Sequence, residues 1–463
     1  MIYKRTLVYI LLLILVLSAV FTKDYFLFMQ GYYFKKIFIY FLFIIIFVQF
    51  TILRVPKINY NVTVLMLYSL LVFTQFITLF QSIDYENQNI LKNIISFILF
   101  SFIVFLHYYG LRNFYYILQE KFIDYFFKAF YFALGIILLV NFIQLFSILI
   151  PSIFQGTEQF IANNLVLQWY RPDPEDKRFY TIANSYVQST HRLNGLVEET
   201  SEDVAILFVG FMPLILGKLT ASLKLGYSLS QYKSTLIWYS LIILILLLSK
   251  SSSGLLFAGI SILFLFYIYI RYASASTNIV VLSLFFILIL SVTVVNIDML
   301  NHYWSKLFDD TSVSTLSRSG VTLGLMSMSF DNLFTGVGKG MVSYSLESYI
   351  PLWSYTYEIE TWINNQGFPA LSMFFWLISE YGLPLLFIIV YIFFKTYQKL
   401  KGLSNFNTQY YIVFKSYKYF LIILFIALQS QTMIYKSLLL LVLTFYIVVG
   451  ENSKYTINYQ GKT

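Results

Sequence analysis

The sequence predicts an all-α polytopic membrane protein with about twelve transmembrane helices and two long extracytoplasmic loops. Hydrophobic residues make up 59% of the chain and charged residues only 11%, whereas soluble domains have roughly 45–50% and about 25%. Apolar runs of roughly 17 or more residues recur, each long enough to cross a hydrocarbon core about 30 Å thick. Two polar segments, Pro151–Asp203 (the first island) and Asn296–Gly367 (the second island), interrupt these runs and hold most of the carboxylates.

The expected spans follow from the apolar runs, and a turn at 249–254 separates two of them. They cover residues 6–22, 37–53, 62–81, 93–110, 129–150, 204–220, 234–249, 253–270, 278–296, 369–396, 411–430 and 432–449. We therefore divide the chain into spans in 1–150, a first outer loop at 151–203, spans in 204–296, a second outer loop at 297–368, and spans with a cytoplasmic tail in 369–463. Lys4 and Arg5 precede the first apolar run as in a signal peptide, but no small-residue cleavage site closes it, so we expect an uncleaved helix.

The orientation follows from the basic residues of the short loops, which concentrate on the cytoplasmic side of membrane proteins. With the N-terminus inside, the inner side holds Lys4, Arg5, Arg54, Lys57, Arg112, Lys121, Lys128, Lys218, Lys224, Lys233, Arg271, Lys395, Lys399, Lys401, Lys415 and Lys418. The short outer loops hold only Lys23, Lys35, Lys36, Lys92 and Lys250. This roughly threefold excess predicts that both termini are cytoplasmic and both islands extracytoplasmic.

Composition also excludes several classes of partner and site. The net charge of +9 reflects loop lysines beside anionic lipid, so we expect no nucleic-acid partner. The absence of cysteine excludes disulfides, thiol nucleophiles and thiolate metal sites. The three histidines, His107, His191 and His302, are scattered without metal-ligand spacing, and no Ser/His/Asp pattern is present. We therefore expect neither a metal nor a cofactor.

Few charges lie within the expected spans, and Glu380 and Lys436 are the clear cases. Glu380 is near a helix break that Gly382 and Pro384 predict. A carboxylate inside the membrane is a candidate functional group, but an acid hydrogen-bonded where helices pack fits this position equally well. Lys436 is close enough to a helix end for its ammonium to reach the membrane surface.

The first island ends in a motif, 191–203, directly before a span. Thr200 or Ser201 can cap that helix, and Glu202 and Asp203 suit its first turn, so these residues need no catalytic role. Arg192 and the neighbouring pair Glu198 and Glu199 are not explained in this way. Arginine suits bidentate phosphate contacts, and a carboxylate can accept a proton from a sugar hydroxyl. The earlier stretch 171–178 is Pro-rich and of mixed charge, which is typical of a solvated turn.

The second island contains Arg318, an amphipathic segment at 321–330 and a Gly-x-Gly-x-Gly sequence at 336–340. The glycine sequence lacks the full phosphate-loop spacing and a preceding strand, so we expect a tight turn with positive φ angles rather than a nucleotide site. Its backbone amides could still contact a diphosphate. Glu358, Glu360 and Trp362 place an aromatic ring beside acids, which suits sugar stacking.

Three sequence blocks, in this order, resemble the O-antigen polymerase and O-antigen ligase superfamily of polysaccharide assembly. Residues 191–205 resemble its Arg-x-x-Gly motif followed by an acidic helix cap. Residues 248–255 resemble its Ser-Arg-Ser/Thr-Gly helix start, and 318–383 its arginine, its glycine turn and its closing Glu-x-Gly-Leu. The topology covers nearly the whole chain, and the motifs cover about a quarter of it.

The sequence departs from the family pattern at two places. Ser252 stands where the family often has arginine, and Lys250 two residues earlier is a substitute cation without the guanidinium fork. Ligases commonly carry a His-Asn pair at the positions of Leu371 and Ser372. The second departure favours a polymerase over a ligase.

The resemblance implies a metal-independent membrane glycosyltransferase in the bacterial cytoplasmic (inner) membrane. A growing glycan on undecaprenyl diphosphate would be the donor, and a lipid-linked repeat unit the acceptor. It implies that Arg192 and Arg318 stabilise the diphosphate, Glu198 acts as base with Glu199 as substitute, and a groove between helices holds the prenyl chains. Weaker phosphate or glycan contacts are expected from Lys250, Lys339, Glu358, Glu360 and Trp362.

The expected partners are undecaprenyl-diphosphate-linked oligosaccharides and membrane lipids, with a chain-length regulator and a flippase as candidates. The product class (O-antigen of lipopolysaccharide, capsule or exopolysaccharide) stays open. Two alternatives also stay open: a ligase-type or protein-glycosylating transferase, and a lipid-linked oligosaccharide flippase or other transporter.

Overall fold

A computed structural model describes residues 2–20, 44–46, 48–49, 62–81, 90–119, 121–165, 185–197, 200–272, 313–364, 367–369, 371–429 and 437–451. Within these ranges every regular element is a helix, and seven helices are long and apolar enough to cross a membrane. The all-α class is therefore confirmed and the apolar helices are consistent with a membrane protein, whereas the total of about twelve spans and the two long outer loops stay predictions. The expected turn at 171–178, the span at 278–296 and Lys436 lie outside the described residues.

The helices follow the expected spans closely where both can be compared. Their bounds are α1 Ile2–Val20, α3 Val62–Gln81, α4 Ile90–Leu118, α5 Lys121–Leu149, α6 Pro151–Asn164, α7 Tyr186–Thr190, α8 Thr200–Ala205, η2 Ile206–Phe211, α9 Met212–Lys224, α10 Leu229–Leu248, α11 Ser252–Tyr272, α14 Val313–Asp331, α15 Val342–Ser345, η3 Leu346–Tyr349, η4 Leu352–Ser354, α16 Tyr357–Asn364, α17 Met373–Leu403, α18 Thr408–Leu428 and α19 Ser437–Glu451. The turn expected at 249–254 indeed separates α10 from α11.

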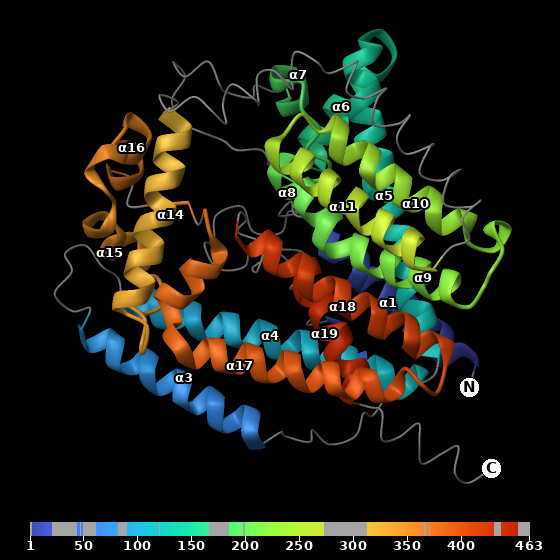
Figure 1. Ribbon diagram of the computed structural model, residues 1–463, viewed down its shortest axis with the longest axis horizontal. Coiled ribbons are helices and arrows are strands. Elements are labelled where there is room, and N and C mark those ends of the chain that lie inside the picture. The colour runs from blue at the N-terminus through green and yellow to red at the C-terminus, as the bar shows by residue number, and fades with distance from the viewer. Residues whose placement is uncertain are drawn as a thin grey trace.

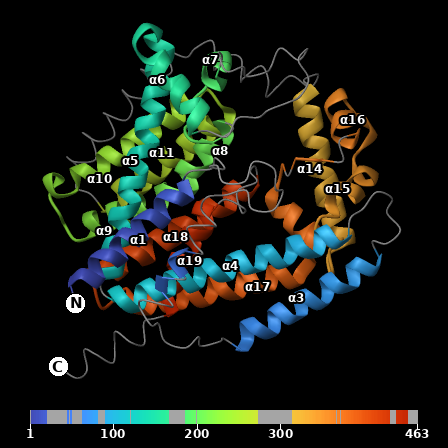
Figure 2. The same cartoon turned by 180° about the vertical axis from the view of Figure 1, so that it is seen from behind.

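The helices form two groups (Figure 1). The larger group packs α5, α10, α11, α18 and α19 around the continuous α8–η2–α9 helix, and α1 and α4 pack outside it against α5 and α19. The smaller group sets α14, α15 and α16 on the first half of α17. Helix α3 packs along α17, and the view from behind shows α4 beside them (Figure 2).

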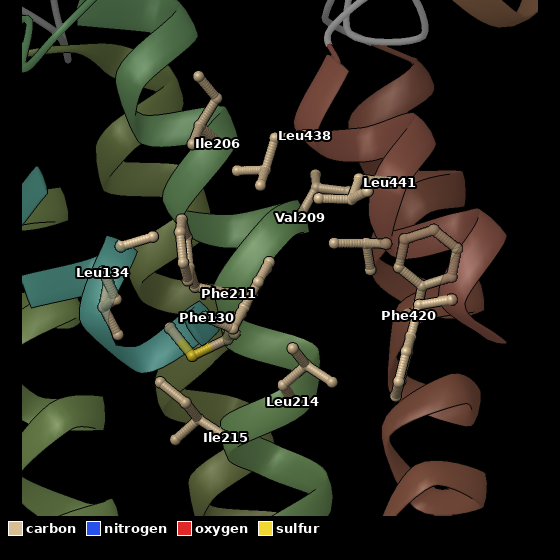
Figure 3. Close-up of a cluster of buried hydrophobic side chains, with 14 of the residues drawn as sticks. Phe130, Leu134, Ile206, Val209, Phe211, Leu214, Ile215, Phe420, Leu438 and Leu441 are labelled. Carbon is tan, nitrogen blue, oxygen red and sulfur yellow. The ribbon is translucent and has the colours of Figure 1, made fainter. Parts of the chain in front are cut away.

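A π-helical segment, η2, lies at the centre of the larger group. Pro213 follows it and has no backbone N–H, so the regular α-helical bond to the carbonyl four residues earlier cannot form. The N–H of Met212 instead reaches Leu207, five residues back. The wider turn directs Phe211 against Phe130, with ring centroids 4.4 Å apart, inside a fully apolar cluster (Figure 3).

The islands contain helices of their own. The first contributes α6 and α7, and the second contributes α14 to α16 with two short 3-10 turns. The amphipathic segment expected at 321–330 lies within α14, where Val321, Leu325 and Met328 share one buried face at helical spacing. In both views the helices of the two islands lie on the same side of the molecule, away from the start of α1 (Figures 1 and 2).

Helix ends that the orientation rule places in the cytoplasm gather at the other end of the bundle. The hydroxyls of Tyr115 and Tyr410 are 3.2 Å apart, joining the end of α4 to the start of α18. Glu451 at the end of α19 accepts a hydrogen bond from Tyr108 and lies 3.8 Å from the Lys399 ammonium. These contacts join helix ends that the basic loop residues predict to lie on the same, cytoplasmic side.

Helices α9 and α18 approach most closely at Gly217. A Cβ atom at this position would lie 2.0 Å from Ser416 Oγ and 2.5 Å from the Ser416 backbone nitrogen. Gly217→Ala should therefore force the two helices apart and lower the apparent melting temperature in detergent, by an overpacking cost of about 1–3 kcal/mol.

Gly259→Ala is the matched control, because no atom lies within 4 Å of the added Cβ there. Equal melting temperatures for the two variants would contradict this account of the α9–α18 contact.

Candidate functional site

Arg192 lies in a rigid turn between α7 and α8. Ser185 caps α7 by accepting the Gln188 N–H at 3.2 Å, and His191 ends it in the left-handed conformation with φ 53°. Leu193, Asn194 and Gly195 are then buried, while Arg192 itself is half-buried. Within the described residues Arg192 has no ion pair. The turn therefore holds a guanidinium at the surface on a buried backbone.

The side-chain amide of Gln144 on α5 clamps this turn. Its Oε1 accepts the backbone N–H groups of Asn194 and Gly195 at 3.1 and 2.9 Å. Its Nε2 donates to Asn194 Oδ1 and to the Gly195 carbonyl, both at 2.9 Å. Gln144 is buried, and both ends of its amide are used. The clamp fixes the backbone two residues after Arg192.

Gly195 is required by the packing under the turn. It has φ 56°, and a Cβ there would lie 2.1 Å from Asp203 Oδ1 and 3.1 Å from Asn141 Nδ2. Asp203 is buried in the first turn of α8, where the sequence placed it as a helix-start acid. Its second oxygen, Oδ2, has no hydrogen bond to the described residues.

Glu198 and Glu199, the expected base and its substitute, lie outside the described residues. The acid of α6, Glu158, is buried and accepts a hydrogen bond from Gln188 of α7 at 3.2 Å. Burial raises the pKa of this carboxyl, and hydrogen bonds from Ser185 and Gln188 oppose the rise. Glu158 joins α6 to α7 beneath the Arg192 turn.

Lys250 lies in the tight turn between α10 and α11 with φ 54°. Ser251 caps α11 by accepting the Gly254 N–H at 3.0 Å, and Ser249 Oγ donates to the Leu246 carbonyl. A Cβ on Gly254 would lie 2.2 Å from Ser249 Oγ, so the glycine is a packing requirement. The serine-rich block that resembles the family motif thus builds a helix hairpin that presents Lys250.

Arg318 lies on α14 with an exposed side chain and no ion pair within the described residues. Its neighbours are held firmly, because Ser317 Oγ lies 2.6 Å from Thr356 Oγ1 and Gly320 packs against Ser354. In α16, Glu360 is exposed and Glu358 half-buried. Trp362 packs against the core of this unit, and its ring centroid lies 6.4 Å from that of Phe368 in a T-shaped arrangement.

Lys339 is paired with Glu380 rather than isolated in a loop. Its ammonium lies 3.2 Å from Glu380 Oε1, with side-chain exposures of 15% and 1%. The same carboxylate oxygen accepts the Gly340 N–H at 2.7 Å, and Gln75 of α3 accepts the Lys339 N–H at 2.9 Å. Of the two roles open for Glu380, the structure favours the acid hydrogen-bonded where helices pack.

The glycine turn docks into the break of α17. Gly336, Gly338 and Gly340 all have positive φ, as expected, and Gly382 breaks the helix with φ 66°. Val337 and Gly338 donate to the carbonyls of Ser379 and Glu380 at 2.7 and 3.1 Å. A Cβ on Gly338 would lie 2.7 Å from Thr78 Oγ1 of α3, and one on Gly340 would lie 2.4 Å from Asn93 Oδ1 of α4, so the turn also lies against these two helices.

The expected site residues therefore fall into separate places. Arg192 and Lys250 belong to the larger helical group, whereas Arg318, Lys339 and α16 belong to the smaller one. No direct contact between Arg192 and Arg318 occurs in the described structure. Sequence reasoning missed Gln144 and Gln75, for which the available signal was an amide side chain inside an apolar span.

Comparison with protein-family models finds no match, and comparisons with curated proteins and with solved structures find none either.

The Lys339–Glu380 pair yields a direct test. Lys339→Met or Glu380→Gln alone leaves one buried charge without its partner, which typically costs about 3–5 kcal/mol. Each single variant should therefore lower the apparent melting temperature, and the double variant should recover part of the loss because neutrality is restored. Fluorescence-detected size-exclusion thermostability in detergent measures all three.

The exposed pair of Lys128 and Asp124, 2.9 Å apart on α5, is the control, since surface ion pairs contribute only about 0–1 kcal/mol. Purely additive losses in the Lys339/Glu380 double variant would contradict a coupled pair.

Proposed function

We propose that this chain is a polysaccharide polymerase of the bacterial cytoplasmic membrane. It transfers a growing glycan from undecaprenyl diphosphate to a lipid-linked repeat unit, at the outer face and without a metal or a nucleotide sugar. The observation that carries the proposal is the Arg192 turn: a guanidinium next to a buried backbone that Gln144 binds at Asn194 and Gly195, at the island end of an apolar helix bundle. Pre-positioned cations of this kind stabilise charge that develops in a transition state.

The arrangement of the islands supports an outer site. Helices α6, α7 and α14 to α16 lie on one side of the bundle, while the lysine-bearing helix ends near Lys399 and Glu451 gather at the other end (Figure 1). If the basic end is cytoplasmic, as loop charges usually are, both islands face outward. Lipid-linked glycans presented at that face would meet Arg192 and the exposed Arg318 on α14.

The proposed chemistry is a displacement at the anomeric carbon of the donor sugar. An acceptor hydroxyl attacks that carbon, the glycosidic bond to the diphosphate breaks, and the lipid diphosphate leaves. Arg192 and Arg318 stabilise the negative charge on the leaving group. Glu198, with Glu199 as substitute, takes the hydroxyl proton. Lys250 remains a weaker phosphate contact, and Lys339 a weaker one still because Glu380 already neutralises it.

The break in α17 is the feature that a flippase or transporter would share, and its contacts can be compared with that alternative. Transporter sites often form at broken helices that carry buried charges, and α17 is broken at Gly382 beside Glu380. Here, however, the glycine turn satisfies the carbonyls of Ser379 and Glu380 at the break, and Lys339 pairs with the carboxylate. The break is thus filled by the protein's own backbone, which supports the enzyme over the transporter.

The proposal predicts the surface glycan of cells that lack the gene. A chain-length gel should show loss of the polymer ladder, with single repeat units still attached. Loss of all attached glycan with accumulation of lipid-linked polymer would indicate a ligase instead. Repeat units trapped on the carrier at the cytoplasmic face would indicate a flippase.

Arg192→Ala should reduce polymer formation roughly 10²–10³-fold, as for the loss of other charge-stabilising donors. Arg192→Lys should retain partial activity, because the charge remains while the bidentate fork is lost. Ladder intensity at matched membrane protein levels measures both. A normal ladder from properly inserted Arg192→Ala would remove this residue from the site.

A further inference from the structure

Three cations converge at the end of the larger group opposite the islands. Lys224 ends α9, Arg271 lies in the last turn of α11, and Lys415 lies in α18. The ammonium groups of Lys224 and Lys415 lie 4.7 and 5.3 Å from the centre of the same ring, that of Tyr411. Lys415 and Arg271 likewise share the ring of Tyr272, at 6.0 and 5.6 Å. The aromatic rings therefore hold three positive charges together.

No carboxylate neutralises this cluster within the described residues. The chain has no Asp or Glu between Asp203 and Asp298, nor between Glu380 and Glu451, so α9, α10, α11 and α18 carry none. The described ion pairs Lys399–Glu451 and Lys128–Asp124 involve none of the three cations. Like charges that converge without a counterion repel one another, so the cluster is suited to an external anion.

A hydrogen-bond donor lies within the cluster. The hydroxyl of Tyr411 is buried and has no hydrogen-bond partner among the described residues, although Lys224 and Lys415 both contact its ring. A buried hydroxyl without a partner is unfavourable because it has lost its hydrogen bonds to water. An acceptor oxygen on a bound anion would satisfy it.

An apolar stripe leads along α11 to the cations. Leu263, Tyr267 and Ile270 recur at helical spacing with exposures of 68%, 50% and 71%, and Arg271 follows directly. The Arg271 guanidinium donates to the Tyr267 hydroxyl at 2.7 Å, at the boundary between the stripe and the charged cluster. An acyl chain along the stripe would place its headgroup at the three cations.

We propose that Lys224, Arg271 and Lys415, with the Tyr411 hydroxyl, form a binding site for a phosphate group, supplied by the headgroup of an anionic phospholipid. Basic pockets between helices on the cytoplasmic side recognise such headgroups through charge and hydrogen bonds. The site lies at the opposite end of the bundle from the Arg192 turn (Figure 1) and does not depend on the proposed glycan transfer. It would anchor the ends of α9, α11 and α18 to one lipid molecule.

The test uses the full-length protein in detergent, with native mass spectrometry during titration with phosphatidylglycerol or phosphatidylcholine. We expect preferential retention of one phosphatidylglycerol. Each cation near a headgroup contributes roughly a fivefold gain in affinity, so Lys224→Gln, Arg271→Gln and Lys415→Gln together should weaken binding about a hundredfold. Tyr411→Phe, which removes only the hydroxyl, should weaken it about fivefold.

The matched control removes three exposed lysines outside the cluster, by Lys233→Gln, Lys401→Gln and Lys418→Gln. It has the same net charge as the triple cluster variant and should bind like the wild type. Competition by millimolar inorganic phosphate would show that the phosphate alone is recognised, whereas its failure to compete would assign recognition to the whole phospholipid; both results support the site. Unchanged affinity in the cluster variant, or an equal loss in the control, would overturn it.

Discussion

The structure depends on one constraint: backbone polar groups among apolar helices must find partners inside the protein. Regular helices satisfy their own backbone groups along most of the chain. Where a helix is irregular, other hydrogen bonds replace the missing ones. At Pro213 the chain widens into a π turn so that the Met212 N–H reaches Leu207. At Gly382 the break in α17 is filled by the glycine turn, whose N–H groups bond the carbonyls of Ser379 and Glu380. The second island is thereby tied to the membrane helices by main-chain hydrogen bonds.

Uncharged amide side chains of the apolar helices also provide hydrogen-bond partners for backbone groups of the two islands. Gln144 on α5 and Gln75 on α3 both lie in apolar helices. Gln144 binds the backbone of the first island through both its donor and its acceptor, whereas Gln75 accepts the Lys339 N–H of the second island and donates to the Glu380 carbonyl of α17. A buried amide with all its bonds made costs little, whereas a buried charge requires a partner, as Glu380 does in Lys339. The membrane helices therefore act as a frame that positions the loops expected to carry the chemistry.

Parts of the candidate site could be predicted from local sequence. The break at Gly382, the positive φ angles of the glycine turn and the amphipathic face of α14 depend on residues close together in the chain. The pairing of Lys339 with Glu380 and the clamp of Gln144 on Gly195 could not be predicted in this way, because they join residues far apart in sequence. The family resemblance suggested Lys339 as a phosphate contact, and its ion pair with Glu380 became visible only in the tertiary structure.

Local sequence was enough to predict an all-helical chain with apolar helices of membrane-spanning length, the positions of these helices in the described residues, and the separation of α10 from α11. These features follow from hydropathy and helix-breaking residues, which act over one or two turns. The tertiary structure alone decided which polar groups meet: Gln144 with the Arg192 turn, Glu380 with Lys339, and the three cations with the tyrosines of α11 and α18. Apolar helix faces resemble one another too closely to specify their neighbours, so close contacts such as Gly217 against Ser416 select the packing that brings these groups together.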